Sequence, residues 1–440
     1  MPSFLQRLDE ALSQLPAVNG FLVAFSGGVD SCVLLHALKQ GHPDEPIHAI
    51  HVNHQLQADA AHWALHCQSF CKALDIPLQQ QVIEVNASRG ESLEARAREL
   101  RYRVFEQQLR DNECLLTAHH QDDQAETLLL QLLRGAGPHG LAAMPAVARF
   151  ALGYHARPLL NFTRDEIHAY ARQHGLQWIE DRSNADTAFD RNFLRHEIVP
   201  RLKQRWPSAA CTLSRSAHLC ADAAQLLDAR AKDLLDNVTV AGAAQLLVPA
   251  LQRLTDSDCR NVLRYWLHQS GLPLPAAAHL QAIMRTVIQA REDAQPLVKW
   301  GDAEVRRFDD ALYAMHALAP HDSHRVYDWD GQQSLAVAGV GVLSVHPAAD
   351  DGINLQRLRH ARLQVRFRQG GERCRQHGHA HSQSLKNLFQ QWRIPPWQRD
   401  RIPLIYNDEE LVCVVGYSIC EGYRAGEGEP GVLLRVETQS

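Results

Sequence analysis

The stretch that decides the fold is Phe21-Leu-Val-Ala-Phe-Ser26-Gly27-Gly28-Val29-Asp30-Ser31. Apolar residues typical of a buried strand end at two glycines, and the helix-forming sequence Cys-Val-Leu-Leu-His-Ala-Leu follows directly. Because the glycines carry no side chain, backbone N–H groups can approach an anion closely, and the N-terminus of the next helix adds the positive end of its dipole. The stretch therefore predicts a phosphate-binding turn between a strand and a helix.

Three side chains in this turn suit the same purpose. Ser26 and Ser31 would add hydroxyl donors to an anion, and Asp30 stands where it could reach a magnesium ion that bridges phosphates. The turn lacks both the Gly-Lys-Ser/Thr of a Walker A loop and the GxGxxG of a dinucleotide-binding turn. The hexapeptide therefore indicates a phosphate site of another class.

Short apolar runs alternate with helical patterns around this turn. The runs 21–25, 47–52, 78–85 and 114–118 each lead into a segment with helical periodicity. Such alternation predicts a parallel sheet with helices on both faces. We predict an α/β protein with an N-terminal doubly wound parallel sheet, followed by a helical middle domain and a small α+β C-terminal domain.

The length of 440 residues predicts about three domains. Changes of pattern give an N-terminal domain at 1–207, a helical connector at 208–236, a helical middle domain at 237–320, a linker region at 321–352 and a basic C-terminal domain at 353–435. Strands are expected in the last domain at 404–406 and 411–415.

Charge is distributed unevenly along the chain. It carries 45 Lys and Arg against 50 Asp and Glu, a net charge of −5, yet ten basic residues and a single acid, Glu372, lie in 353–399. A concentrated basic segment on a near-neutral protein indicates a contact surface for nucleic acid. Phe389, Trp392 and Trp397 lie in the same segment, where they could stack on unpaired bases or belong to a core.

The composition also indicates the cellular compartment of the protein. The ten cysteines form no CxxC pair, which indicates free thiols in a reducing environment. There is no run of 18 apolar residues, and the N-terminus lacks the apolar core of a signal peptide. We therefore expect a cytoplasmic protein without membrane contact, and no obligate protein partner is evident.

A series of motifs carries a resemblance to a known family. Ser26-Gly27-Gly28-Val29-Asp30-Ser31 resembles the PP-loop of the N-type ATP pyrophosphatases, which cleave ATP to AMP and pyrophosphate. The motifs that follow are His51-Val-Asn53-His54-Gln-Leu56, Glu94-Ala-Arg-Ala-Arg98-Glu-Leu-Arg101-Tyr102, Thr117-Ala-His119-His120-Gln-Asp122-Asp123-Gln124-Ala-Glu126-Thr127, Arg134-Gly135, Arg157-Pro158-Leu159-Leu160, Asp181-Arg-Ser183-Asn184-Ala-Asp186 and Arg191-Asn192-Phe-Leu-Arg195. Over residues 20–200 the series is similar to the tRNA(Ile)-lysidine synthetase family, and Lys386-Asn-Leu-Phe with Ile394-Pro-Pro-Trp397 resembles its last domain.

The resemblance implies a ligase that uses ATP and Mg²⁺ as cofactors. ATP would adenylate the carbonyl oxygen of the wobble cytidine in the isoleucine tRNA with a CAU anticodon, and the ε-amine of L-lysine would then expel AMP to form lysidine. A cytosine carbonyl is a poor electrophile, so adenylation turns its oxygen into a good leaving group. The partners would be this tRNA and L-lysine. We expect the N-terminal domain to hold the anticodon loop and the basic C-terminal domain to grip the acceptor-stem side.

Candidate site residues follow from the motifs. For ATP we predict Ser26, Gly27, Gly28, Val29, Asp30, Ser31, His51, Asn53, Arg134 and Gly135, with Asp30 also holding Mg²⁺ through the pyrophosphate. For lysine we predict Asp123 and Glu126, which share a helix face. For tRNA we predict Arg98, Arg101, Arg191, Arg195, Arg366, Arg368, Arg373 and Arg375. The catalytic residues would be Asp30, Asp123 and Arg195.

Simpler structural interpretations stay open for several of these residues. Glu94 and Arg98 have the spacing of an ordinary helix ion pair. Arg134-Gly135 is a common helix ending, and Asp122 could cap a helix.

Two other functions also remain possible. A tRNA 2-thiolation enzyme would share the loop but normally needs paired cysteines, and here Cys67 and Cys71 are spaced CxxxC. A non-catalytic tRNA-binding relic is disfavoured by the intact acids Asp30, Asp122 and Asp123.

Overall fold

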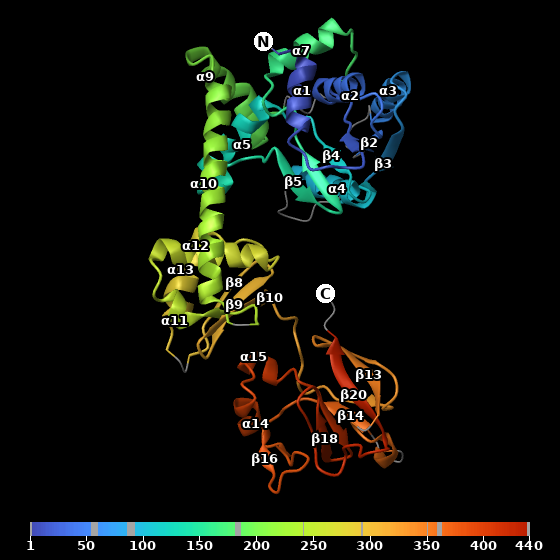
Figure 1. Ribbon diagram of the computed structural model, residues 1–440, viewed down its shortest axis with the longest axis vertical. Coiled ribbons are helices and arrows are strands. Elements are labelled where there is room, and N and C mark those ends of the chain that lie inside the picture. The colour runs from blue at the N-terminus through green and yellow to red at the C-terminus, as the bar shows by residue number, and fades with distance from the viewer. Residues whose placement is uncertain are drawn as a thin grey trace. The chain divides into compact units, whose positions relative to one another are not determined.

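The computed structural model describes residues 2–53, 60–85, 93–180, 186–240, 242–291, 294–349, 351–358 and 363–437 (Figure 1). The chain forms two compact units, Met1–Leu227 and Asp228–Ser440. No helix among the described residues is long and apolar enough to cross a membrane.

The first unit alternates helices and strands. Its elements are α1 (Phe4–Leu12), β1 (Phe21–Ala24), α2 (Val29–Gly41), β2 (Ile47–Asn53), α3 (Ala60–Ala73), β3 (Leu78–Val82), α4 (Leu93–Gln108), β4 (Cys114–Leu116), α5 (Gln121–Leu133), α6 (Pro138–Leu141), β5 (Val147–Phe150), β6 (Gly153–Ala156), α7 (Arg164–Gln173), α8 (Asp190–Phe193), η2 (Leu194–Ile198) and α9 (Val199–Arg205). Helix α10 (Ala209–Val238) continues from this unit into the second.

The strands form one six-stranded sheet in the order β3-β2-β1-β4-β6-β5. All neighbours are parallel except β5, which runs antiparallel to β6. The chain moves from β1 outward to β2 and β3, and then returns to place β4 on the other side of β1. Ligands of open α/β sheets bind at such a reversal, outside the carboxyl ends of the strands. The fold therefore predicts a ligand site at the segments that follow β1 and β4.

Helices cover both faces of the sheet, as predicted (Figure 1). On β1, Phe21 and Val23 are buried with residues of α1, α2, α3 and α7, whereas Leu22 is buried with Phe105 of α4 on the opposite face. This alternation follows from the two-residue period of a strand. Because both faces are covered, β1 is a continuous apolar run, which is why its sequence was recognisable.

The four strands predicted at 21–25, 47–52, 78–85 and 114–118 are confirmed by β1 to β4. Strands β5 and β6 form a hairpin that was not predicted from the sequence. Each has four residues, and the hairpin closes through Phe150 and Gly153 around Ala151, a non-glycine residue at φ 46°. The turn therefore lacks the usual Asn-Gly or Asp-Gly signal.

In the described part of the second unit there are short helices and four sheets. Its elements are β7 (Leu246–Leu247), α11 (Val248–Leu251), α12 (Asp256–Gln269), α13 (Ala277–Ala282), η3 (Ile283–Ile288), β8 (Leu297–Trp300), β9 (Ala303–Phe308), β10 (Ala311–His316), β11 (Tyr327–Trp329), β12 (Leu335–Val337), β13 (Gly341–Ala349), η4 (Leu355–Leu358), β14 (Leu363–Arg366), β15 (Arg373–Cys374), β16 (Gln383–Ser384), α14 (Leu385–Gln391), α15 (Pro396–Arg399), β17 (Leu404–Asn407), β18 (Glu410–Val414), β19 (Ser418–Ile419) and β20 (Pro430–Glu437).

The helices of the middle segment pack with a sheet that the sequence analysis did not foresee. Strands β7, β10, β9 and β8 form an antiparallel sheet, and their apolar residues share one core with α12, α13 and η3. Residues 321–352, predicted as a linker region, contain β11, β12 and β13, which pair with strands of the C-terminal sheets. The predicted strands at 404–406 and 411–415 correspond to β17 and β18. The domain boundaries themselves stay a prediction.

Candidate active site

Strand β1 leads the chain into the predicted phosphate-binding turn at the reversal point of the sheet. The hydroxyls of Ser26 and Ser31 lie 3.1 Å apart, and Ser31 Oγ donates to the carbonyl of Gly28 at 2.9 Å. Gly28 is the N-cap of α2, and no side chain caps that helix. Backbone and hydroxyl donors are thus grouped at a helix N-terminus, the arrangement that binds phosphate.

Gly27 has to be glycine for two reasons. Its φ of 83° lies in the left-handed region, and a Cβ there would stand 3.0 Å from both Cys67 Sγ and Ile179 Cδ1. Its carbonyl also accepts a hydrogen bond from the N–H of Ile179 at 2.9 Å. Cys67 and Ile179 therefore pack against the turn, and they restrict the conformation of its backbone.

Asp30 lies in the first turn of α2, beside this loop. Its side chain is 37% exposed, but Oδ1 is buried without a hydrogen bond, and His120 Nε2 lies 3.8 Å from it. Burial raises the pKa of the Asp30 carboxyl, and the charge of Asp123 adds to this, while His120 opposes it. A buried carboxylate oxygen without a hydrogen bond at this place could bind a cation.

The surroundings of Asp30 fit Mg²⁺ in one particular way. Among the described residues no group of three or more His, Cys, Asp and Glu could hold a metal ion by itself. Mg²⁺ commonly binds through one or two carboxylates together with the phosphates of a nucleotide. A single free carboxylate oxygen next to a phosphate-binding turn suits that mode of binding.

Strand β4 ends beside β1, and the predicted His-His-x-Asp-Asp segment follows it. His120 caps α5: its Nδ1 accepts from the N–H of Asp122 at 3.2 Å, and Asp123 Oδ2 accepts from the N–H of His120 at 3.0 Å. The cap is therefore His120 and not Asp122. His120 Nε2 also lies 3.5 Å from Asp123 Oδ2, so the ring stands between the acids of α5 and Asp30.

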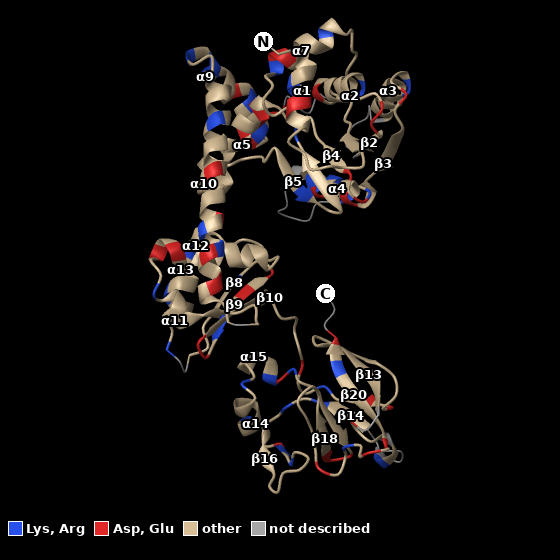
Figure 2. Ribbon diagram, viewed as in Figure 1, with Lys and Arg blue, Asp and Glu red and all other residues tan. Residues whose placement is uncertain are grey.

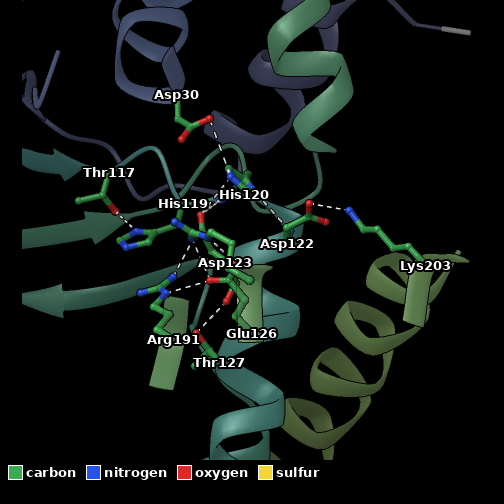
Figure 3. Close-up of polar contacts among 11 residues, drawn as sticks. Asp30, Thr117, His119, His120, Asp122, Asp123, Glu126, Thr127, Arg191 and Lys203 are labelled. Carbon is green, nitrogen blue, oxygen red and sulfur yellow. Dashed lines mark hydrogen bonds and ion pairs between the residues drawn. The ribbon is translucent and has the colours of Figure 1, made fainter. Parts of the chain in front are cut away.

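Two acids of α5 and two arginines of the 190–198 segment form a single charged cluster. Figure 3 shows three of its members, Asp123, Glu126 and Arg191. Arg191 donates to Asp123 Oδ1 at 2.9 Å and to Glu126 Oε2 at 3.0 Å. Arg195 donates to Asp123 Oδ1 at 2.7 Å and to Glu126 Oε1 at 2.7 Å. Glu126 is 1% exposed, while each arginine side chain is about one quarter exposed. We call these four side chains the Asp123–Arg195 cluster.

The cluster favours the charged forms of Asp123, Arg191 and Arg195. Burial alone would raise the pKa of the Asp123 carboxyl, but His120, Arg191 and the neighbouring cations outweigh it and hold this pKa below its usual value. Burial likewise opposes the charge on Arg191 and Arg195, yet the acids raise the pKa of both guanidinium groups. Beside the cluster, Lys203 Nζ on α9 lies 2.6 Å from Asp122 Oδ2.

A second polar chain runs from β6 to the same place. Arg157 donates to His155 Nδ1 at 3.2 Å, His155 Nε2 lies 2.9 Å from Thr117 Oγ1, and Thr117 Oγ1 lies 2.8 Å from His119 Nδ1. Thr117, His119 and Arg157 belong to the motifs quoted above, but no role was predicted for them. His155 was not recognised as a site residue. Residues 117 and 155 are neighbours only because β4 pairs with β6.

The residues predicted for the adenosine lie at the end of β2. His51 is buried, its Nδ1 donates to the carbonyl of Phe25 at 3.0 Å, and burial lowers its pKa. Asn53 is half-buried, and His54 lies outside the described residues.

Arg134 and Gly135 end α5, and Gly135 has a φ of 71°. This agrees with their interpretation as a common helix ending. Their roles in ATP binding stay predictions.

The predicted tRNA contacts fall into different environments. Arg98 is exposed on α4, with its guanidinium 5.0 Å from the ring centroid of Tyr102. Arg101 is half-buried on the same helix, whereas Arg191 and Arg195 belong to the Asp123–Arg195 cluster. Glu94 carries no described side chain, and Ser183 and Asn184 lie outside the described residues.

Figure 2 shows both basic and acidic residues in the C-terminal part of the chain, and some of the acids pair with the basic segment 353–399. Arg366 lies 2.9 Å from Glu409 and stacks over Tyr406, and Arg368 lies 3.4 Å from Asp400. These acids come from outside 353–399, so part of the net positive charge of that segment is neutralised. Arg373 donates to the hydroxyl and carbonyl of Ser382, and Arg375 is exposed.

The aromatic residues of the segment are packed against protein. Phe389 is fully buried in a core cluster, so it is no candidate for base stacking. Trp392 stacks on Tyr417 with ring centroids 5.3 Å apart. Trp397 makes edge contacts with Tyr313 and Phe308.

The glycine turn after β1, at the reversal point of a parallel sheet and beside a free carboxylate, defines a nucleotide-binding protein of the PP-loop class. The family model described as "PP-loop domain" matches residues 2–202. Two further models match, the "TilS substrate binding domain" over residues 246–313 and the "TilS substrate C-terminal domain" over residues 363–437.

Curated relatives narrow the class. The tRNA(Ile)-lysidine synthase of Coxiella burnetii is 43% identical over 436 residues, which cover 98% of this chain and 96% of that protein. The enzyme of the same name from Methylococcus capsulatus is 41% identical over 412 residues, which cover 93% of this chain and 94% of that protein. The chain belongs to the tRNA(Ile)-lysidine synthase family and is thus a ligase-type enzyme that uses ATP to modify tRNA.

Proposed function

We propose that this enzyme joins L-lysine to the wobble cytidine of the isoleucine tRNA with a CAU anticodon. ATP first adenylates the cytidine carbonyl oxygen and releases pyrophosphate, and the lysine ε-amine then attacks the ring carbon and expels AMP. The observation that carries the proposal is the phosphate-binding turn of β1 placed beside a cluster of buried acids and arginines. The family relationship supports the identity of the substrates.

We assign ATP to the turn formed by Ser26, Gly27, Gly28, Val29, Asp30 and Ser31. The hydroxyls and the uncapped N-terminus of α2 supply donors to the phosphates. Mg²⁺, when bound, would neutralise charge on the departing pyrophosphate, and Asp30 Oδ1 is the protein oxygen available to hold it.

We assign the amino-acid head of lysine to the Asp123–Arg195 cluster. An amino acid carries an ammonium and a carboxylate on neighbouring atoms, and the cluster presents buried carboxylates and partly exposed guanidinium groups within 3.0 Å of one another. Asp123 and Glu126 would receive the ammonium, and Arg191 or Arg195 would receive the carboxylate. The two acids and two arginines already balance in charge before lysine enters.

The thiols near the loop are unsuited to sulfur transfer. Cys67 and Cys71 are buried in the core of the first unit, and burial raises the pKa of each thiol to about 12. A thiol with so high a pKa is almost entirely protonated at neutral pH, and the thiolate is the nucleophile. The ten free cysteines agree with our proposal that the enzyme acts in the cytoplasm.

The direct test is an assay of AMP release with a transcript of the CAU isoleucine tRNA. The full chain should release AMP from ATP only when both the tRNA and L-lysine are present, and the product tRNA should be heavier by the mass of lysine less one water. AMP release that ignores lysine, with no mass increase on the tRNA, would contradict the proposed ligation.

Asp123→Asn should impair the use of lysine more than the use of ATP. Losing a charged hydrogen bond to an ammonium costs about 1.5–3 kcal/mol, which corresponds to a rise in the KM for lysine of roughly 10- to 150-fold. Steady-state kinetics with each substrate varied in turn would measure this. Asp122→Asn, which removes the charge facing Lys203, is the matched control. An unchanged lysine KM would place the lysine site elsewhere.

We also propose that the C-terminal segment contacts tRNA through its accessible arginines. Arg373→Glu with Arg375→Glu should weaken tRNA binding and reduce its salt dependence, by a slope of about one for each phosphate that an arginine neutralises. Arg366→Glu with Arg368→Glu should reduce stability as well, because both side chains face acids of their own unit. Binding isotherms at several salt concentrations, with melting curves, would separate the two effects. Equal binding by both variants and the unmodified chain would exclude this surface.

A further inference from the structure

The polar chain from Arg157 to His119 has only one possible direction of hydrogen bonding. A guanidinium can donate but cannot accept, so His155 Nδ1 must accept the bond from Arg157. Burial, with the charge of Arg157 added, lowers the pKa of His155 to about 3, so this ring is neutral at physiological pH. A neutral imidazole that accepts at Nδ1 carries its proton on Nε2.

The same logic continues along the chain. His155 Nε2–H donates to Thr117 Oγ1 at 2.9 Å, so the hydroxyl proton of Thr117 is left to point at His119 Nδ1, 2.8 Å away. His119 Nδ1 therefore accepts. Burial keeps the pKa of His119 well below its usual value, so its single proton must lie on Nε2. Thr117 and His155 are both nearly inaccessible to water, which protects the relay from exchange with solvent.

His119 Nε2 is the free end of this relay. The hydrogen bond of this ring to a described residue is made by Nδ1, and none is made by Nε2. His119 Nε2 is also not one of the fully buried side-chain atoms without a partner. His119 directly precedes the cap of α5, and the charged group that acts on it most is the carboxylate of Asp123. That carboxylate is already paired with Arg191 and Arg195. Arg157 and Arg98 add further positive charge, so a fixed N–H donor beside this excess of guanidinium groups suits an anionic oxygen.

We propose that His119 donates a hydrogen bond from Nε2 to an anionic oxygen of a substrate, and that Arg157, His155 and Thr117 are positioning residues that hold its tautomer. The inference deepens the proposed function and rests on it. The oxygen belongs either to the carboxylate of lysine or to a phosphate of ATP. The relay selects an acceptor at this point and disfavours a donor such as an amino group.

The tautomer can be measured without activity. In the full chain labelled with ¹⁵N-histidine, long-range proton–nitrogen NMR should show His119 with a protonated Nε2 and a bare Nδ1 at neutral pH; comparison with His119→Gln assigns its signals. Thr117→Val should mix the two tautomers, whereas Thr117→Ser should preserve the original one. A His119 ring with the proton on Nδ1, or protonated on both nitrogens, would overturn the relay.

Kinetics then identify the oxygen. His119→Phe should raise a KM roughly tenfold, the effect of one hydrogen bond, and His119→Gln should recover part of the loss through its amide donor. If the partner is the lysine carboxylate, the KM for lysine rises but that for lysinamide does not. If it is a phosphate, ATP-dependent adenylation slows and the lysine KM is unchanged. If a variant that melts normally changes neither the KM for lysine nor the rate of ATP-dependent adenylation, the proposal is wrong. If the wild-type enzyme does not use lysine at all, only the proposed function is refuted.

Discussion

Asp30→Asn should release AMP at least about 100-fold more slowly than the unmodified enzyme, because stabilisation of phosphate charge by a metal is worth several kcal/mol. Asp30 Oδ1 is the orphaned oxygen beside the turn, and the asparagine substitution removes its charge while preserving its shape. Tight ATP binding through the turn itself should survive in part. AMP formation with tRNA and a series of magnesium concentrations would show whether excess metal restores the rate.

The same variant should melt at the same temperature or higher. Because burial raises the pKa of Asp30, the folded protein binds this proton more tightly than the unfolded chain does, and the ionised carboxyl at neutral pH opposes folding. This contribution becomes more favourable as pH falls through the raised pKa. Asp256→Ala, which removes an exposed acid from the first turn of α12, is a matched control that should leave AMP release intact. Full AMP release by a well-folded Asp30→Asn would refute the assignment of the loop.

Glu126→Gln should strongly destabilise the first unit. It leaves Arg191 and Arg195 facing one carboxylate at a site where Glu126 is 1% exposed. Breaking a buried pair typically costs about 3–5 kcal/mol, and at about 2–4 °C per kcal/mol for a unit of this size the melting temperature should fall by roughly 6–20 °C. Thermal and urea melts of the full chain, followed by a probe in the first unit, would measure the loss.

Asp122→Asn provides the comparison for that change. Its partner Lys203 is 38% exposed, so water can solvate the freed ammonium and the loss should stay near 1 kcal/mol. Combining Glu126→Gln with Arg195→Met should restore part of the stability, because the unpaired guanidinium is removed. If Glu126→Gln cost no more than Asp122→Asn, the Asp123–Arg195 cluster would not exist in solution.

Several features were predictable from the sequence because their causes are local. The run from Phe21 to Ser31 has a strand, two glycines and a helix start within eleven residues, and each is recognisable without knowledge of any partner. The parallel sheet follows from repeating that alternation, since β1, β2 and β4 are largely buried. The family resemblance rests on the same property, because its motifs are short and contiguous.

The environment of each charged residue could be decided only by the tertiary structure. Asp123 and Glu126 look in the sequence like exposed acids of a helix start, yet 68 residues separate Asp123 from Arg191, and only the return of the chain past α5 makes them partners. The basic segment behaves in the same way: Arg366 and Arg368 meet Glu409 and Asp400, acids that lie outside it.

The hydrogen-bonding direction at His119 is the clearest example of this division. The sequence determined that two histidines follow β4, because they stand in one contiguous motif. It could not determine the proton position on the ring of His119. That depends on Arg157 and His155, which reach Thr117 through the pairing of β4 with β6. Backbone pattern is set by neighbours in sequence, whereas charge and proton placement are set by neighbours in space.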